Sequence, residues 1–279
     1  MIGGSVGQRT VLVGCDFVES SQWPVSAVFQ VEPAKDQPAE IISSEWASDP
    51  AVDTRVYFDL YGNPCRRLTI PVGRSVMSYR ATALVPDATE DVDLDAPEML
   101  PSELPDDVLL YTLPSRYCLP DVLGQEAWTR FGNVTPGYGR VQAICDYVHN
   151  HLQFAYGSST ARTTAADVHE SRYGVCRDFT HLAVSLCRAL NIPARYVFGY
   201  LPEIEVEEQR GLPMDFAAWM EVWLGNRWFT FDPRNNEHRK GRVLIGRGRD
   251  AADVAMLTTF GAPYLQSMTV IAEEASNIS

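Results

Sequence analysis

Cys176 is the side chain in this sequence with the strongest signs of chemical activity. It stands in the stretch SRYGVCRDF, immediately before a strong helical pattern. A thiol at the start of a helix meets unpaired backbone N–H groups and the positive end of the helix dipole, and Arg177 adds positive charge, so we expect a lowered thiol pKa. A small buried cysteine at a helix start is the alternative. Cys176 is therefore a candidate nucleophile.

Asp232 is the second candidate, because a predicted hairpin fixes what it faces. With Gly225 and Asn226 as a two-residue loop, the register pairs Leu224 with Arg227 and, further along, Trp219 with Asp232. Asp232 then lies diagonal to residue 217, about 7–8 Å away. A histidine there would be oriented by Asp232, but residue 217 is alanine. The plainer interpretation makes Asp232 a turn residue before Pro233.

The elements that position these residues follow an α+β order. Apolar residues recur at helical spacing over 140–152 and 178–190, and Asn191 and Pro193 end the second helix. Three strands follow, at 194–201, 219–224 and 228–232. We expect one helix, with Cys176 at its start, to pack against an antiparallel sheet.

The first hundred residues alternate apolar and polar side chains in several short segments separated by turn signals. This pattern predicts an all-β, sandwich-like domain without a catalytic cluster. Residues 86–107 hold nine acidic residues and no Lys or Arg, which predicts a solvated linker or long loop. We therefore divide the chain into a β-rich domain, 1–110, and a core with a C-terminal extension, 111–279.

Composition excludes several classes of function. The net charge is −13, with no basic patch for a phosphate backbone, so we expect no nucleic-acid partner. No apolar run is long enough to cross a bilayer and the start lacks a secretory pattern, so we expect a cytoplasmic protein without a membrane partner. The six cysteines are scattered without metal-ligand spacing. We expect neither a metal nor another cofactor; the oligomeric state is open.

Three longer stretches carry a resemblance to a known family. GVCRDFTHLAVSLCRALNIPARYVFGYL, MDFAAWMEVWLGNRWFTFDPRNN and GRVLIGRGRDAADVAMLTTFG are similar to the bacterial transglutaminase-like family, members of which are often described as cysteine proteases. LYGNP and LPSRYCLPD resemble that family's N-terminal region. The resemblance implies a papain-like core with a Cys, His, Asp triad, in which Cys176 is the nucleophile and Asp232 the aspartate.

Ala217 breaks this pattern, because the family has histidine there. Losing a general base typically costs about 10²–10⁴-fold in rate. Among the other histidines, His181 should point elsewhere on its helix, and His238 could fold back over the cleft. Asp215 or Glu221 would serve as base only if burial raised its pKa, and a solvated or structural carboxylate is the better interpretation.

Two functions remain open. The first is cysteine-dependent acyl transfer or amide hydrolysis through Cys176 on a peptide or amide substrate, as a hydrolase or acyltransferase with an atypical base. The second is a catalytically silent transglutaminase-fold module, a pseudoenzyme that binds a peptide or protein partner. Chemistry without an imidazole is a third possibility that only the retained Cys176 and Asp232 support.

Overall fold

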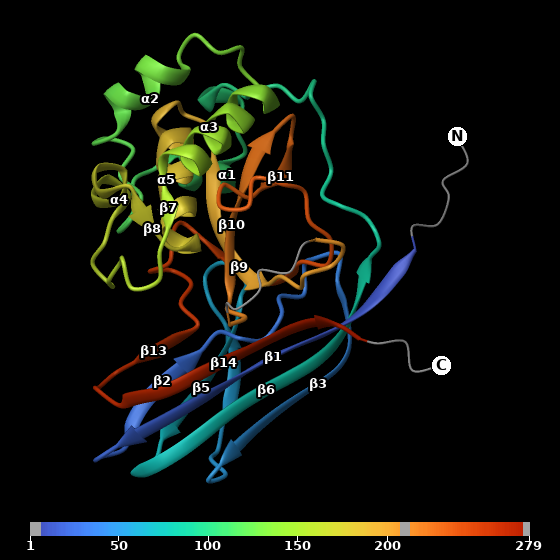
Figure 1. The fold of residues 1–279 in the computed structure, drawn as a ribbon, viewed down its shortest axis with the longest axis vertical. Coiled ribbons are helices and arrows are strands. Elements are labelled where there is room, and N and C mark those ends of the chain that lie inside the picture. The colour runs from blue at the N-terminus through green and yellow to red at the C-terminus, as the bar shows by residue number, and fades with distance from the viewer. Residues whose placement is uncertain (1–6, 207–212, 276–279) are drawn as a thin grey trace.

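Two four-stranded antiparallel sheets form the N-terminal region of the protein. The computed structural model describes residues 7–206 and 213–275. One sheet has the order β14 (Tyr264–Glu274), β1 (Gln8–Ser21), β6 (Gly73–Pro86), β3 (Glu40–Asp49); the other has β13 (Leu257–Thr259), β2 (Val25–Phe29), β5 (Pro64–Ile70), β4 (Arg55–Phe58). Their alternating apolar residues, among them Phe17, Phe29 and Met77, form one buried cluster. The predicted β-rich N-terminal region is confirmed (Figure 1).

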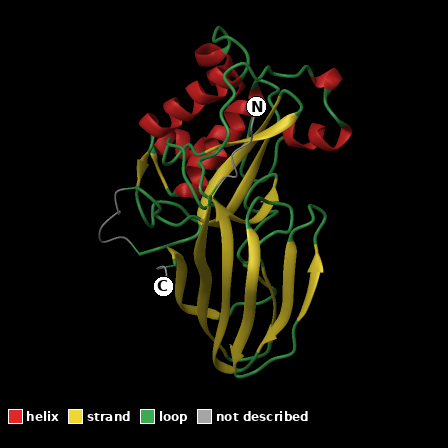
Figure 2. Ribbon diagram, turned by 90° about the vertical axis from the view of Figure 1, so that its right-hand side faces the viewer, coloured by secondary structure: helices red, strands yellow, loops and turns green. Residues whose placement is uncertain are grey.

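A third sheet carries the helices. Its order is β11 (Arg227–Phe231), β10 (Ala217–Leu224), β9 (Ala194–Tyr200), β12 (Val243–Gly248), all antiparallel. A short parallel pair, β7 (Gln153–Phe154) and β8 (Tyr173–Gly174), forms a small sheet of its own. The helices gather at the end of the molecule away from the long strands (Figure 2), and are α1 (Asp106–Leu109), α2 (Gly124–Phe131), α3 (Tyr138–His151), α4 (Ala165–Ser171) and α5 (Cys176–Ala189). None in the described ranges is long and apolar enough to cross a membrane.

Helix α5 is the central helix of this region, and its limits follow from the local sequence. Its apolar side chains, such as Phe179, Leu182 and Leu186, pack into a cluster that includes inward-facing residues of β10 and β11. At its N-terminus the Asp178 carboxylate accepts the backbone N–H of Val175 at 2.8 Å. At its C-terminus Asn191 adopts a φ of 62°. The helix therefore begins two residues earlier than the apolar pattern indicates, at Cys176 itself.

The hairpin between β10 and β11 has the predicted register. Leu224 pairs with Arg227, Trp223 with Trp228, and the pairing continues to Met220 and Phe231. Gly225 and Asn226 both have positive φ, 53° and 68°, as a two-residue turn of this type requires. Residues 217, 219 and 221 consequently share one face of β10, while 218, 220 and 222 share the other.

The C-terminal strands return to the N-terminal sheets. β14 pairs with β1 from Val11 opposite Glu274 to Ser20 opposite Tyr264, and β13 pairs with β2. The sequence pattern did not indicate this pairing, because both strands follow the core in the chain. The division at residue 110 stays a prediction, with the addition that residues 257–274 complete both sheets of the first region.

The acidic segment 86–107 is irregular for most of its length, as predicted, yet several of its carboxylates are tied to the folded regions. Asp87 accepts from Arg9 at 2.7 Å and from Lys240 at 2.8 Å, and Glu98 pairs with Arg140 at 3.1 Å. The description as a solvated linker is therefore incomplete, because ion pairs fasten this segment to the core.

Glu19 makes the stability of the protein depend on pH. Its carboxyl group is buried in β1 opposite Ser75 of β6, and neither side chain has a hydrogen-bond partner. Burial raises the pKa of Glu19 to about 7, above the unfolded value of about 4.3. The contribution of Glu19 to stability should therefore be greatest below about pH 4 and be lost as the pH rises through 7. Glu19→Gln should flatten this fall and add about 1–2 kcal/mol at pH 8.

Urea unfolding at pH 5 and pH 8 measures this effect. Glu45→Gln, an exposed position on β3, is the matched control and should keep the wild-type dependence on pH. Identical pH profiles for wild type and Glu19→Gln would contradict the assignment.

Candidate active site

Cys176 opens into a cavity of about 250 Å³. It is the first residue of α5, and its thiol faces the strand entering β10, with Sγ 3.6 Å from the carbonyl oxygen of Phe216. Ala217 lines the same cavity, together with the side chains of Asp215 and Arg234. The structure thus brings the predicted nucleophile next to the position where the family has histidine.

The expected lowering of the Cys176 pKa is wrong. Burial raises the pKa of the thiol to about 11, and the carboxylate of Asp215 adds to the rise. The positive charge of Arg234 opposes this rise, as do the backbone amides of Ala218 in β10 and Arg177 at the helix start, but together they act more weakly than burial. The Arg177 guanidinium is itself bonded to Asp178, 3.0 Å away. The thiol is consequently protonated at neutral pH.

Asp232 is buried directly after β11, and both oxygens of its carboxylate accept two hydrogen bonds each. Oδ1 accepts the backbone N–H groups of Arg234 at 3.2 Å and Asn235 at 3.0 Å. Oδ2 accepts from the Asn235 side chain at 2.8 Å and from Arg242 Nη2 at 2.8 Å. A carboxylate offers about four acceptor positions, so these four bonds leave none for an imidazole. Burial alone would raise the pKa of Asp232, but Arg242 and the bonds from Asn235 lower it.

Arg242 links Asp232 to two other parts of the structure. Its guanidinium also pairs with Glu90 of the acidic segment and lies 4.8 Å from the ring centre of Trp219. Asp232 lines a small cavity that it shares with Glu90 and His238, separate from the one that Cys176 lines. The two predicted site residues thus belong to neighbouring but different cavities, and their catalytic roles stay predictions.

None of the five histidines, all within the described ranges, lines the Cys176 cavity. His181 is in the core, where its Nε2 accepts the backbone N–H of Ala251 at 3.1 Å and burial lowers its pKa to about 3. His238 lies 3.7 Å from Glu90 and does not fold over the cleft of Cys176. No histidine therefore takes the place of the missing one.

The two carboxylates considered as substitutes line different cavities. Glu221 faces the other cavity and pairs with Arg195 and Arg247. Asp215 lines the Cys176 cavity; burial raises its pKa, although its Oδ1 accepts the Phe216 N–H at 2.7 Å. Of these two carboxylates, Asp215 is the one that shares a cavity with the Cys176 thiol, and its raised pKa is what a proton acceptor near neutral pH requires.

Sequence reasoning did not identify Arg242, Asn235 or Arg239 as site residues. Asn235 follows Asp232 closely enough to be suspected as its partner, since Asp commonly bonds to groups two or three residues on. Arg242 is ten residues from Asp232 across a loop, and no local pattern marks it. Across residues 7–206 and 213–275, no group of His, Cys, Asp and Glu side chains gathers that could hold a metal ion.

The sequence and the fold are similar to those of known proteins. Residues 126–233 match the sequence profile of the Transglutaminase-like superfamily. A crystal structure of a "putative cysteine protease" from Cytophaga hutchinsonii is 30% identical, covers 97% of this chain and 92% of its own, and superposes with a TM-score of 0.87. The chain belongs to the transglutaminase-like superfamily. The expected transglutaminase-like, papain-like core is thereby confirmed.

Curated relatives of this transglutaminase-like protein match over a shorter region. An uncharacterised protein of Mycobacterium leprae is 33% identical over 119 residues, which is 42% of each chain. An uncharacterised protein of Mycobacterium tuberculosis is 34% identical over 122 residues, 41% of this chain and 39% of its own. The matches span about two fifths of those relatives, so they carry no whole-protein activity over to this chain.

The raised pKa of Cys176 predicts slow alkylation at neutral pH. The rate of iodoacetamide labelling at Cys176, followed by peptide mass spectrometry, should rise tenfold per pH unit up to pH 9 without levelling off, because the thiolate is the reactive form. Cys187, buried in α5, is the internal control and should stay unlabelled. A plateau below pH 8 would show that an activating group lowers the pKa after all.

Proposed function

We propose that this protein is a binding module on a transglutaminase-like fold, whose Cys176 cavity holds the backbone of an extended peptide without cleaving it. The observation that carries the proposal is the state of Asp232, whose four acceptor positions are already filled by Arg242, Asn235 and Arg234. An aspartate in that state cannot orient a base, and Ala217 supplies none.

The cavity retains groups suited to an amide. The backbone N–H groups of Arg177 and Ala218 act on Cys176 Sγ, and together they can donate to a peptide carbonyl held beside the thiol. The protonated thiol does not attack that carbonyl, because the thiolate is the nucleophile. The same donors that would stabilise an oxyanion in an enzyme therefore serve here for ground-state binding.

A second function is favoured by one observation, the raised pKa of Asp215 in the same cavity. In that alternative Asp215 takes the thiol proton as Cys176 attacks an amide carbon, and returns it to the departing amine. The acyl group then passes to water or to another amine. The negative charge of Asp215 counts against this route, because it raises the pKa of the thiol it would have to deprotonate.

Acetyl-Ala-Gln-Gly-amide is a suitable probe for both functions. Under the proposal, titrating it into the ¹⁵N-labelled protein shifts the amide signals of Arg177 and Ala218, neither ammonia nor cleaved peptide forms, and Cys176→Ala binds equally well. Turnover that disappears in Cys176→Ala and in Asp215→Asn would establish the second function instead. Glu203→Gln, which alters another carboxylate of this cavity, is the matched control. Absence of any shift at millimolar peptide would overturn the proposal.

Restoring the missing histidine gives a separate test. Ala217→His should leave the protein without amidase activity toward the same peptide, because Asp232 has no acceptor position for the new imidazole. If Ala217→His acquires ammonia-releasing activity, Asp232 is available after all and only the histidine was lacking. Circular dichroism spectra of the variant show whether it is folded.

A further inference from the structure

Exposed apolar side chains gather at the end of the N-terminal sheets that lies away from the helices (Figure 2). Three connections cross from one sheet to the other there, between β1 and β2, between β5 and β6, and between β13 and β14. The strand register places them together, because Ser21 lies opposite Gly73 and Ser20 lies opposite Tyr264. We call this surface the distal end; it is at the lower left of Figure 1 and consists of residues 21–24, 71–74 and 259–265.

The large side chains of the distal end are in contact with solvent. Trp23, Val72, Phe260 and Tyr264 are between 59% and 71% exposed, and Leu265 is 44% exposed. Apolar residues exposed singly are ordinary, but a group of them on one surface indicates contact with a partner or a membrane. The distal end is therefore a candidate interaction surface.

The distal end carries almost no charge, although the protein is strongly acidic. Its one charged residue is Arg74, in a chain whose net charge is −13. The neighbouring connection, 50–54, carries Asp53. This connection stands back from the distal end, because β3 stops opposite Val76 rather than opposite Gly73. The acidic groups of the chain therefore do not prevent the distal end from approaching lipid phosphates.

The loops of the distal end use several of their polar groups internally. The Ser21 hydroxyl donates to the carbonyl oxygen of Trp23 at 2.6 Å and accepts the Trp23 N–H at 3.4 Å. The Thr259 hydroxyl donates to the carbonyl oxygen of Gly261 at 3.1 Å. Proline, which has no backbone N–H, stands at positions 24, 71 and 263. Loops with few free donors lose little when they move from water into an apolar medium.

We propose that the distal end inserts into the surface of a phospholipid bilayer, with Trp23, Phe260 and Tyr264 at the level where headgroups meet acyl chains. Tryptophan and tyrosine favour that level, because each combines an apolar ring with a polar tip. A protein partner fits less well, because protein interfaces have a polar rim and about one hydrogen bond per 100–200 Å². Zwitterionic lipid is the better match, since an anionic surface repels the rest of this acidic chain.

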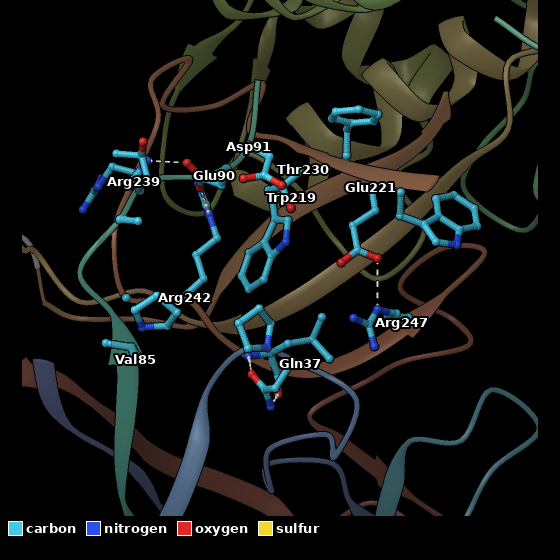
Figure 3. A pocket seen from close by; sticks show the side chains of 18 of the residues that line it. Gln37, Val85, Glu90, Asp91, Trp219, Glu221, Thr230, Arg239, Arg242 and Arg247 are labelled. Carbon is cyan, nitrogen blue, oxygen red and sulfur yellow. Dashed lines mark hydrogen bonds and ion pairs between the residues drawn. The ribbon is translucent and has the colours of Figure 1, made fainter. Parts of the chain in front are cut away.

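The expectation of a protein without a membrane partner rested on the shortness of its apolar runs. Contact with one leaflet of a bilayer does not require a spanning segment. It also leaves the core accessible. The Cys176 cavity and the larger one of about 540 Å³, which Glu221 and Arg247 line (Figure 3), include no described residue of the distal end. Peptide binding at Cys176 and bilayer binding are therefore independent, and either proposal can fail alone.

Flotation with phosphatidylcholine vesicles tests the proposal on the full-length protein. The wild-type protein should float with the vesicles, and the double variant Trp23→Ser, Phe260→Ser should lower the partition coefficient about tenfold or more, because two aromatic side chains no longer enter the bilayer. Trp128→Ser removes a tryptophan of comparable exposure from α2 and is the matched control, which should float like the wild type. Adding phosphatidylglycerol at low salt should weaken binding.

Phosphatidylcholine with brominated acyl chains locates the contact. Bromine quenches nearby tryptophan fluorescence, so quenching should occur in the wild type and be lost in Trp23→Phe, which keeps an aromatic ring and should still float. Failure of the wild type to float, or equal flotation of the double variant, would overturn the proposal. Self-association without lipid that depends on Trp23 would identify a second copy as the occupant and would overturn it as well.

Discussion

The buried guanidinium of Arg242 makes the contacts on which the organisation between the Cys176 cavity and the Asp232 cavity depends. It holds Asp232 after β11, Glu90 of the acidic segment and the ring of Trp219 in β10. Removing one member of a buried ion pair usually costs about 3–5 kcal/mol, because the partner's charge is left uncompensated. The same contact that stabilises the sheet therefore occupies the aspartate that the family's triad would use.

The environment of Cys176 shows how two opposing effects on one thiol are resolved. The charge of Arg234 and the backbone amides of Ala218 and Arg177 favour the thiolate, whereas burial and the charge of Asp215 favour the thiol, and burial prevails. A nearby imidazolium would add a second positive charge in favour of the thiolate. With alanine at position 217 that charge is absent, and the predicted nucleophile is a protonated side chain.

Much of the core could be predicted from sequence because its signals are local. The Gly225–Asn226 turn fixed the register of the hairpin, and the apolar stripe of α5 located the helix within two residues. The thiol pKa could not be predicted, because it depends on how deeply the strand entering β10 covers Cys176. The saturation of Asp232 by Arg242 could not be predicted either, because the two residues meet only through the folded loop. Among the described strands, the pairing of β14 with β1 joins the segments that lie farthest apart in the sequence.

That pairing bears on the order in which the protein is made. β1 and β14 are neighbours in one sheet, yet roughly 250 residues of chain separate them. During synthesis β1 and β6 can pair early, but one edge of β1 stays open until the ribosome has produced the helices, the third sheet and finally β14. An open edge is a site for unwanted strand pairing. Although β1 is translated before the other strands of its sheet, that sheet is completed only when β14 emerges, so the edge of β1 that β14 covers stays open while the intervening chain is made.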